Sequence, residues 1–256
     1  MKVVQCKMKA QNYVGQSFIN NQGLVMKIIE CQKTTSTRVR FENGYETVAQ
    51  LSNIKRGRVA NPYHPTVYGV GYHGEGTYLA KVNGEMTPCY RAWQGMLTRC
   101  YKSNDKEKFI SWKDCSVCEE WHNFQNFARW WHDNYYEVGD ETMHLDKDWL
   151  TKGNKVYSPD TCVIVPQTIN SLLISRKRGR GNCVIGVSKS GKRFCAQMTT
   201  YSKHRSLGMF ETELEAFNTY KRHKEQYIKE VAECYKPHIP TRLYEAMLRY
   251  EVEITD

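Results

Sequence analysis

The sequence predicts an α+β protein that is divided into several domains. Its 256 residues exceed what one small domain needs, and chains of this length often contain more than one core. The first part alternates short apolar runs with turn residues, the middle repeats aromatic residues at helical spacing, and the last part predicts three strands and a helix. We therefore expect modules at residues 1–80, 81–175 and 181–235, with a helical tail at 236–256.

Residues 1–80 are predicted to form a small β-barrel of the SH3-like type. Apolar or β-branched runs at 24–30, 37–41 and 45–51 indicate strands, and Asn43-Gly44 between the last two is a strong hairpin signal. No motif in this module carries recognisable chemistry. Its one basic cluster is typical of a solvated turn and consists of Lys55, Arg56 and Arg58.

The central module is predicted to begin with two helices. Thr87-Pro88 places a proline in the first turn of a helix, where its missing N–H costs nothing, and aromatic residues follow at helical spacing. A second helix over 119–134 puts a row of aromatic residues on one face, which indicates a buried core. Strands at about 143–150 and 157–165 then lead to a helix near 167–174.

The last module is predicted to be a three-stranded sheet covered by a helix. Strands at 183–189, 193–200 and 205–210 are separated by turn residues. Thr212 and Glu215 form a capping-box pattern, which starts the helix. The predicted buried stripe of that helix consists of Leu214, Phe217, Tyr220, Tyr227 or Ile228, and Val231.

The positive charge of the chain is concentrated in one segment. The chain has 37 Lys+Arg and 27 Asp+Glu, a formal net charge of +10. Residues 161–210 contain nine Lys/Arg and no Asp or Glu, so the remainder, with 28 basic and 27 acidic residues, is nearly neutral. A segment with many basic residues and no acidic ones is more typical of a surface that binds a polyanion than of an ordinary solvated surface. Nucleic acid is the usual polyanion.

The middle strand of the last module supplies candidate base contacts. Its alternation puts Phe194, Ala196 and Met198 on the face that the helix covers, and Arg193 and Gln197 on the other. A narrow sheet can enter the major groove of double-stranded DNA, where Arg pairs with guanine and Gln with adenine. The predicted DNA-binding residues are Arg176, Lys177, Arg178, Arg180, Lys189, Lys192, Arg193, Gln197, Thr199, Lys203 and Arg205.

Neither a membrane nor an export route is predicted. No apolar run approaches the roughly 18–20 residues of a membrane span, and the stretch MKVVQCKMKAQNYVG lacks the apolar region of a signal peptide. We expect the protein in the cytoplasm, that of the host cell if a phage encodes it. The ten cysteines are spread through the chain, so we expect reduced thiols rather than disulfides.

The last module resembles the ethylene-response-factor type of DNA-binding domain. The similar stretch is GVSKSGKRFCAQMTTYSKHRSLGMFETELEAFNTYKRHK. It contains the G-V opening at Gly186-Val187, the L-G-x-F-x-T element at 207–212 and the E-x-E-A-x-x-x-Y element at 213–220. Phe194 stands where that family often has tryptophan. The resemblance implies that the sheet binds in a groove of duplex DNA.

The central module resembles the HNH-type homing-endonuclease-like proteins of phages and mobile elements. The similar segments are YRAWQGMLTRCY, CSVCEEWHNFQNF and LDKDWLTKGNKVYSPDTCVIVPQTIN. In that family such segments precede an ethylene-response-factor type domain, in the same order as here. The resemblance implies a ββα-metal unit, in which an acidic residue or a histidine holds a divalent cation and an adjacent histidine activates water.

The HNH resemblance assigns site residues to this chain. Asp146 takes the first metal-ligand position and Lys147 the general-base position, while Thr161 and Asn170 take the central Asn and the final His/Asn positions. Asp146 and Asn170 would hold Mg²⁺ (or Mn²⁺), which prefers oxygen ligands. Lys147 is a poor base unless burial lowers its pKa well below about 10.4. His144, on the same strand face as Asp146, is the alternative catalytic imidazole.

Cys115-x-x-Cys118 has the spacing of zinc ligands, but no second pair of this kind completes the set. The resembling family also carries cysteines at positions that correspond to 100, 118 and 162. Buried apolar thiols are the commoner role of such residues. The alternative is a structural Zn²⁺ held by three or four of Cys100, Cys115, Cys118 and Cys162.

The sequence leaves two functions open. The leading hypothesis is a sequence-specific, Mg²⁺-dependent DNA endonuclease of the homing type, because Asp146, Asn170 and the loop between them are retained. The rival is a DNA-binding transcriptional regulator or recruitment factor without cleavage, which Lys147 and Thr161 favour. RNA binding is less favoured, because Phe194 belongs on the helix-facing side of the sheet. We expect a monomer, with a dimer as the open alternative.

Overall fold

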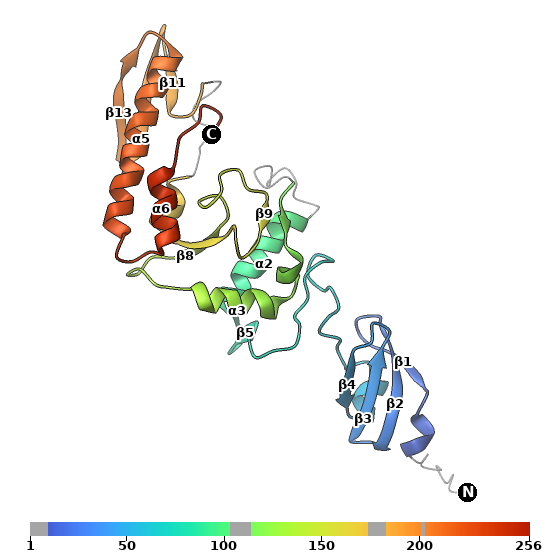
Figure 1. Ribbon diagram of the computed structural model, residues 1–256. Helices are drawn as coiled ribbons and strands as arrows, with labels where there is room; N and C mark the ends of the chain where they lie inside the picture. Colours follow the sequence, from blue (N-terminus) through green and yellow to red (C-terminus); the bar gives the residue numbers. More distant parts are fainter. Residues whose placement is uncertain (1–9, 103–113, 174–182, 201–202) are drawn as a thin grey trace, which may run out of the picture. The chain divides into compact units, whose positions relative to one another are not determined.

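The structure, a computed structural model, describes residues 10–102, 114–173, 183–200 and 203–256. It combines helices with several small sheets, which agrees with the predicted α+β class (Figure 1). Packing divides the chain into two compact units. The first consists of Met1–Lys102 and Glu119–Ala128, and the second of Ser103–Cys118 and Arg129–Asp256.

The first unit begins with an antiparallel sheet of four strands in the order β1-β2-β3-β4. In β3, Thr37, Val39 and Phe41 are buried while their neighbours are exposed, as the alternation of a half-buried strand requires. The elements are η1 (Ala10–Tyr13), β1 (Ser17–Ile19), β2 (Val25–Lys33), β3 (Ser36–Phe41), β4 (Glu46–Ala49) and α1 (Leu51–Lys55).

The predicted SH3-like barrel is wrong, because within residues 10–60 this sheet is an open meander that does not close. The run at 45–51 is not one strand as predicted, since β4 ends at Ala49 and a helix starts at Leu51. Leu51 and Ile54 of that helix are buried in the same cluster as Val39 and Phe41. The apolar face of the sheet is therefore covered by a helical turn rather than by further strands.

The rest of the first unit is an aromatic core around α2. The predicted start of this helix is confirmed: Pro88 is its first residue, and the Thr87 hydroxyl accepts a hydrogen bond from the Tyr90 N–H at 3.2 Å. The Trp93 indole donates to the Trp121 carbonyl at 2.7 Å, and both rings are fully buried. The elements are β5 (Lys81–Val82), β6 (Glu85–Met86), α2 (Pro88–Tyr101) and η4 (Glu119–His122), and α3 (Phe124–Asn134) continues into the second unit.

The second unit contains the strands and helix that were predicted between residues 143 and 174. The order strand, turn, strand, helix is confirmed, but the strand that pairs with β8 starts only at Val163. Val156 and Tyr157 form a separate short strand, which pairs in parallel with β7. The elements are β7 (Ser116–Val117), β8 (Met143–Asp146), β9 (Val156–Tyr157), β10 (Val163–Pro166) and α4 (Gln167–Ser171).

A three-stranded antiparallel sheet and a long helix follow, as predicted. The capping box is present, with Thr212 Oγ1 accepting from the Glu215 N–H and Glu215 Oε2 accepting from the Thr212 N–H, each at 3.2 Å. Leu214 does not belong to the buried stripe, because it is 58% exposed. The elements are β11 (Val187–Ser190), β12 (Arg193–Thr200), β13 (Lys203–Phe210), α5 (Glu213–Tyr235) and α6 (Thr241–Arg249).

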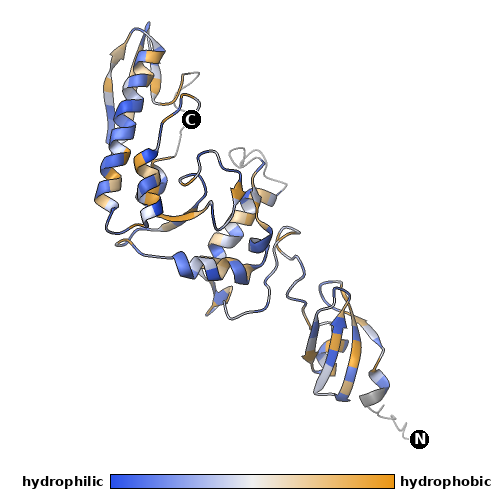
Figure 2. Cartoon of the chain, viewed as in Figure 1, coloured by the Kyte–Doolittle hydropathy of each residue, from blue (hydrophilic) through white to orange (hydrophobic). Residues whose placement is uncertain are grey.

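Helix α5 lies along one face of this sheet, and α6 packs beside it (Figure 1). Apolar residues recur among charged ones along α5 (Figure 2), as is typical of a helix that is buried on one side. Gly186 comes directly before β11 with a φ of +72°, and a Cβ there would lie 2.1 Å from the Tyr220 ring. In the part of the chain that the structure describes, no helix is long and apolar enough to cross a membrane.

One hydrophobic core holds most of the second unit together. It contains Trp149 from the loop after β8, Ile169 from α4, Ala196 from β12, Ile228 from α5 and Leu243 from α6. Residues from the three predicted modules 81–175, 181–235 and 236–256 therefore share one core. The tail at 236–256 is too short to bury much apolar surface by itself, and packing the three segments together increases the buried area.

Candidate functional site

The sheet face that α5 leaves uncovered is the first candidate site, and we call it the outer face. In β12, Ala196 and Met198 are buried under α5, whereas Arg193 and Thr199 are exposed and Gln197 is partly exposed. The two predicted faces of this strand are therefore confirmed. A narrow sheet with one free face has the shape that fits a DNA groove.

The register of the sheet decides which charged residues lie on the outer face. Residues that are directly opposite in an antiparallel pair point to the same side. A bulge next to Gln197 puts Ser206 opposite Gln197 and His204 opposite Thr199, so Ser206 and His204 belong to the outer face. Ser188, Ser190, Cys195 and Met209 join them through the pairs that they form.

Three predicted DNA-binding cations point to the other side. Arg205 lies opposite Met198, Lys203 opposite Thr200 and Lys189 opposite Phe194, which places all three on the α5 side of the sheet. They are nevertheless exposed, since Lys203 and Arg205 lie in one edge strand and Lys189 in the other. The outer face itself thus carries mainly uncharged groups, with cations along its margins.

Arg193 is the cation on the outer face, and it is held within the sheet. Its Nε lies 3.0 Å from Glu211 Oε1, and its guanidinium donates to the Met209 carbonyl at 3.1 Å. Both side chains of the ion pair are at least half exposed. Such an exposed pair contributes only about 0–1 kcal/mol, so a stronger acceptor can replace Glu211. The exposed Lys192 lies in the turn between β11 and β12. Arg176, Lys177, Arg178 and Arg180 lie outside the described residues.

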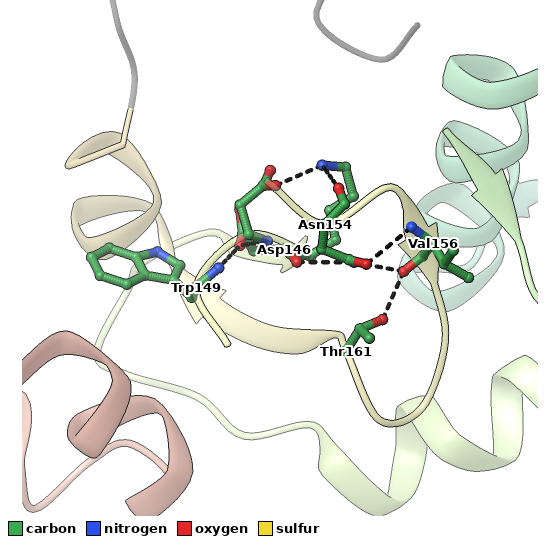
Figure 3. Close-up of polar contacts among 7 residues, drawn as sticks. Asp146, Trp149, Asn154, Val156 and Thr161 are labelled. Carbon is green, nitrogen blue, oxygen red and sulfur yellow. Dashed lines mark hydrogen bonds and ion pairs between the residues drawn. The ribbon is translucent and has the colours of Figure 1, made fainter. Parts of the chain in front are cut away.

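The loop between β8 and β9 is the second candidate site, and Asp146 organises its first turn. Asp146 Oδ1 accepts hydrogen bonds from the backbone N–H of Asp148 at 2.8 Å and of Trp149 at 2.9 Å (Figure 3). Burial raises the pKa of the Asp146 carboxyl, and these two N–H groups partly oppose that shift. The carboxylate therefore closes a turn, the usual role of Asp in this position.

Lys147 is buried in the same loop, with only 5% of its surface exposed. Its ammonium donates to Asp148 Oδ1 and to the Asn154 carbonyl, each at 2.7 Å. A general base needs a free lone pair within reach of the proton that it removes. The Lys147 nitrogen is a donor in both contacts, and the contacts hold it against the loop that it belongs to.

Thr161 and Asn154 fix the other end of the loop. The Thr161 hydroxyl donates to the Val156 carbonyl at 2.7 Å. The Asn154 side chain donates to the carbonyls of Lys147 at 3.2 Å and Val156 at 2.6 Å, and its oxygen accepts from the Val156 N–H at 3.1 Å (Figure 3). Sequence reasoning missed Asn154, although Gly153-Asn154 is a turn signal. The amide that orders this loop thus comes from the turn and not from position 161.

His144 and Asn170 complete the predicted catalytic set. His144 and Asp146 alternate in β8 and so share a face, as predicted. His144 Nε2 is buried, and no described residue forms a hydrogen bond with it. Asn170 is partly buried in α4.

Asp146 and Asn170 are the predicted Mg²⁺ ligands, and the structure shows what the Asp146 carboxylate already binds. Mg²⁺ keeps several water ligands and is usually held by one or two carboxylates. The carboxylate of Asp146 is largely buried, and one of its oxygens is already bound to two N–H groups. Among residues that the structure describes, no group of three or more His, Cys, Asp or Glu side chains is arranged to hold a metal ion.

The four cysteines considered for zinc differ in burial. Cys115 and Cys162 are buried, while Cys100 and Cys118 are partly exposed. Burial raises the pKa of the Cys162 thiol to about 12. A zinc ligand must be a thiolate, and burial in apolar surroundings disfavours that form. The surroundings of Cys162 are those of a small hydrophobic residue in a core.

The chain thus presents an uncovered sheet face with cations at its margins and a tightly bonded loop around Asp146. Comparison with known proteins assigns neither feature to a family. No protein-family model, no curated protein and no solved structure matches the chain.

Proposed function

We propose that the protein is a sequence-specific double-stranded-DNA-binding protein that contacts the major groove with the outer face of its C-terminal sheet. The observation that carries the proposal is the arrangement of this sheet, which has α5 on one side and leaves Arg193, Gln197 and Thr199 accessible on the other. These residues lie in the segment 161–210, which contains no acidic residue. Such a surface suits a polyanion with readable base edges.

The two groups of side chains would have different roles. Arg193 can donate two hydrogen bonds to guanine, and Gln197 can form a bidentate pair with adenine. The exposed cations lie in the two edge strands and in the turn between β11 and β12, so they would contact phosphates on either side of the groove. They are Lys189, Lys192, Lys203 and Arg205.

Substitutions should separate these roles. Arg193→Ala or Gln197→Ala should lower the affinity for the preferred site by about 1–3 kcal/mol and relax the sequence preference. Lys203→Ala should weaken binding to every duplex and reduce the slope of log K against log salt by about one unit. Selection from random duplexes, followed by salt titrations on the selected site, measures both quantities.

Lys229→Ala is the matched control, because Lys229 is an exposed lysine of α5 and belongs to none of the three strands. It should leave preference and salt slope unchanged. The assignment of Lys203 to a phosphate contact fails if its substitution changes the salt slope no more than the control does.

We propose further that the segment around Asp146 supports the binding domain without hydrolysing DNA, as in a regulator or recruitment factor. The hydrogen bonds of Lys147 and the turn closed by Asp146 support this. Metal-dependent hydrolysis is the second candidate. It is favoured by the unpaired Nε2 of His144, a buried imidazole nitrogen on the strand face of Asp146.

Incubation with supercoiled plasmid separates the two candidates. We expect tight binding but no nicking with Mg²⁺ or Mn²⁺ beyond that seen with EDTA. Asp146→Asn is the matched variant, because an amide oxygen can still accept the two backbone N–H bonds while it lacks the charge that binds a metal. Metal-dependent nicking that disappears in Asp146→Asn and in His144→Ala would instead establish an endonuclease.

A further inference from the structure

A cavity of about 360 Å³ lies in the second unit, and residues of the β8–β9 loop form part of its wall. Much of its wall is apolar, with Leu172 and Leu173 after α4, Ile185 before β11 and Val252 near the C-terminus. This volume is at the lower end of the range of about 300–1,000 Å³ that is typical of small-molecule sites. Size and lining therefore suit a compact ligand with an apolar body.

The two carboxylates in the cavity wall are already paired. Asp148 Oδ1 lies 2.7 Å from the Lys147 ammonium, and Asp256 Oδ1 lies 2.9 Å from that of Lys152. Lys152 also donates to the Glu251 carbonyl at 2.8 Å. These charges largely cancel one another, so none of them is available to balance a further cation in the wall.

Lys224 is that further cation. It lies on α5 one turn after Tyr220, and its side chain is partly buried in the cavity wall. Among described residues, none forms a hydrogen bond or ion pair with it. Burial lowers the pKa of the Lys224 ammonium to about 8. A desolvated charge without a partner is unfavourable, and an anion in the cavity would relieve that cost.

We propose that this cavity binds a small organic anion, whose apolar part packs against Leu172, Ile185 and Val252 and whose carboxylate pairs with Lys224. A carboxylate would supply the ion-pair partner that Lys224 lacks among the described residues. The aromatic rings of Tyr220 and Tyr250 also line the cavity and favour a flat apolar body.

The test uses 2-naphthoate as the probe and neutral 2-naphthamide as its isostere, with the full-length protein in a calorimetric titration. We expect naphthoate to bind at least about tenfold more tightly, since a hydrogen bond to a charged group is worth about 1.5–3 kcal/mol. Lys224→Met keeps the length of the side chain, removes the charge and should abolish this preference. Lys229→Met, an exposed change on the same helix, should leave the preference intact.

The affinity for naphthoate should also depend on pH. The ammonium is present below a pH of about 8, and above it the preference for naphthoate over naphthamide should disappear as the amine loses its proton. The other ionisable groups in the wall are Asp148, Lys152, Tyr220, Tyr250 and Asp256, and the Lys224→Met variant controls for them.

Three results would overturn the proposal: equal affinity for naphthoate and naphthamide, an unchanged preference in Lys224→Met, or no binding of naphthoate at millimolar concentration. The first and third are measured on the unmodified protein, so the outcome does not depend on whether a variant folds.

Discussion

Replacing Gly186 with alanine should destabilise the C-terminal sheet and so weaken the DNA binding that we propose for it. Gly186 has a φ of +72°, which costs a residue with a Cβ about 1–2 kcal/mol. The added Cβ would also lie 2.1 Å from the buried ring of Tyr220, and overpacking of this kind costs typically about 1–3 kcal/mol. One cost arises from the backbone conformation at position 186 and the other from contact with the Tyr220 ring, so we expect them to add. Urea unfolding followed by circular dichroism measures the loss.

Gly191→Ala is the control for this prediction. Gly191 also has a positive φ, +61°, but a Cβ there would meet no atom within 4 Å. It should therefore show the backbone cost alone. If both substitutions reduce stability equally, contact with Tyr220 is not what requires glycine at position 186.

Replacing Lys147 with methionine should destabilise the second unit by about 2 kcal/mol. Removing one partner of a buried ion pair costs about 3–5 kcal/mol, because the other charge stays behind unpaired. Asp148 is 40% exposed, so water can solvate it and the cost should be smaller. The Asn154 carbonyl also loses its donor. The midpoint of guanidinium unfolding measures the effect.

Lys152→Met is the comparison, because the Lys152 side chain is 31% exposed against 6% for Lys147, so its ion pairs should contribute less than about 1 kcal/mol. A Lys147→Met protein that keeps full stability but loses a metal-dependent nicking activity of the parent would show that Lys147 acts in catalysis and not in the loop.

The elements that the sequence predicted correctly are those with local signals. Two helices start through contacts within one turn, at Thr87-Pro88 and at Thr212 with Glu215. The residue types at these positions are therefore sufficient to predict where each helix begins. The alternation in β12 likewise depends on a helix that packs against one face of the sheet. That helix, α5, is close in sequence, because only β13 separates it from β12. The two faces of the sheet could therefore be predicted from the order of residue types along the chain.

The elements that it did not predict depend on distant partners. The strands β7 and β9 are two residues each and pair across a separation of forty residues, from Ser116 to Val156, which leaves no periodic pattern in the sequence. The strand β4 ends at Ala49 and the helix α1 fills the core from Leu51, although residues 45–51 contain no turn residue that marks this boundary. Tertiary packing decided both cases.

The sequence predicted only part of the candidate site, because the rest depends on contacts between side chains that residue type does not reveal. Residue type and spacing indicated Asp146 and Lys147, but only the contacts of Lys147 with Asp148 and Asn154 show that its ammonium is a donor in the loop. Lys224 had a signal that was overlooked. It occurs between Tyr220 and Ile228, four residues from each, and so on the buried stripe of α5, where a lysine is unexpected.

The common core of the second unit limits how the proposed DNA-binding segment can be transferred to another protein. A transplanted segment 183–235 would leave behind Trp149, Ile169 and Leu243, and the apolar surface of α5 that packs against them would be in water. Grafting experiments would need to carry the chain from β8 to the C-terminus at least, so that Trp149 is included. Recombination at the junction between the predicted modules would face the same constraint, so these segments would be inherited together rather than exchanged singly.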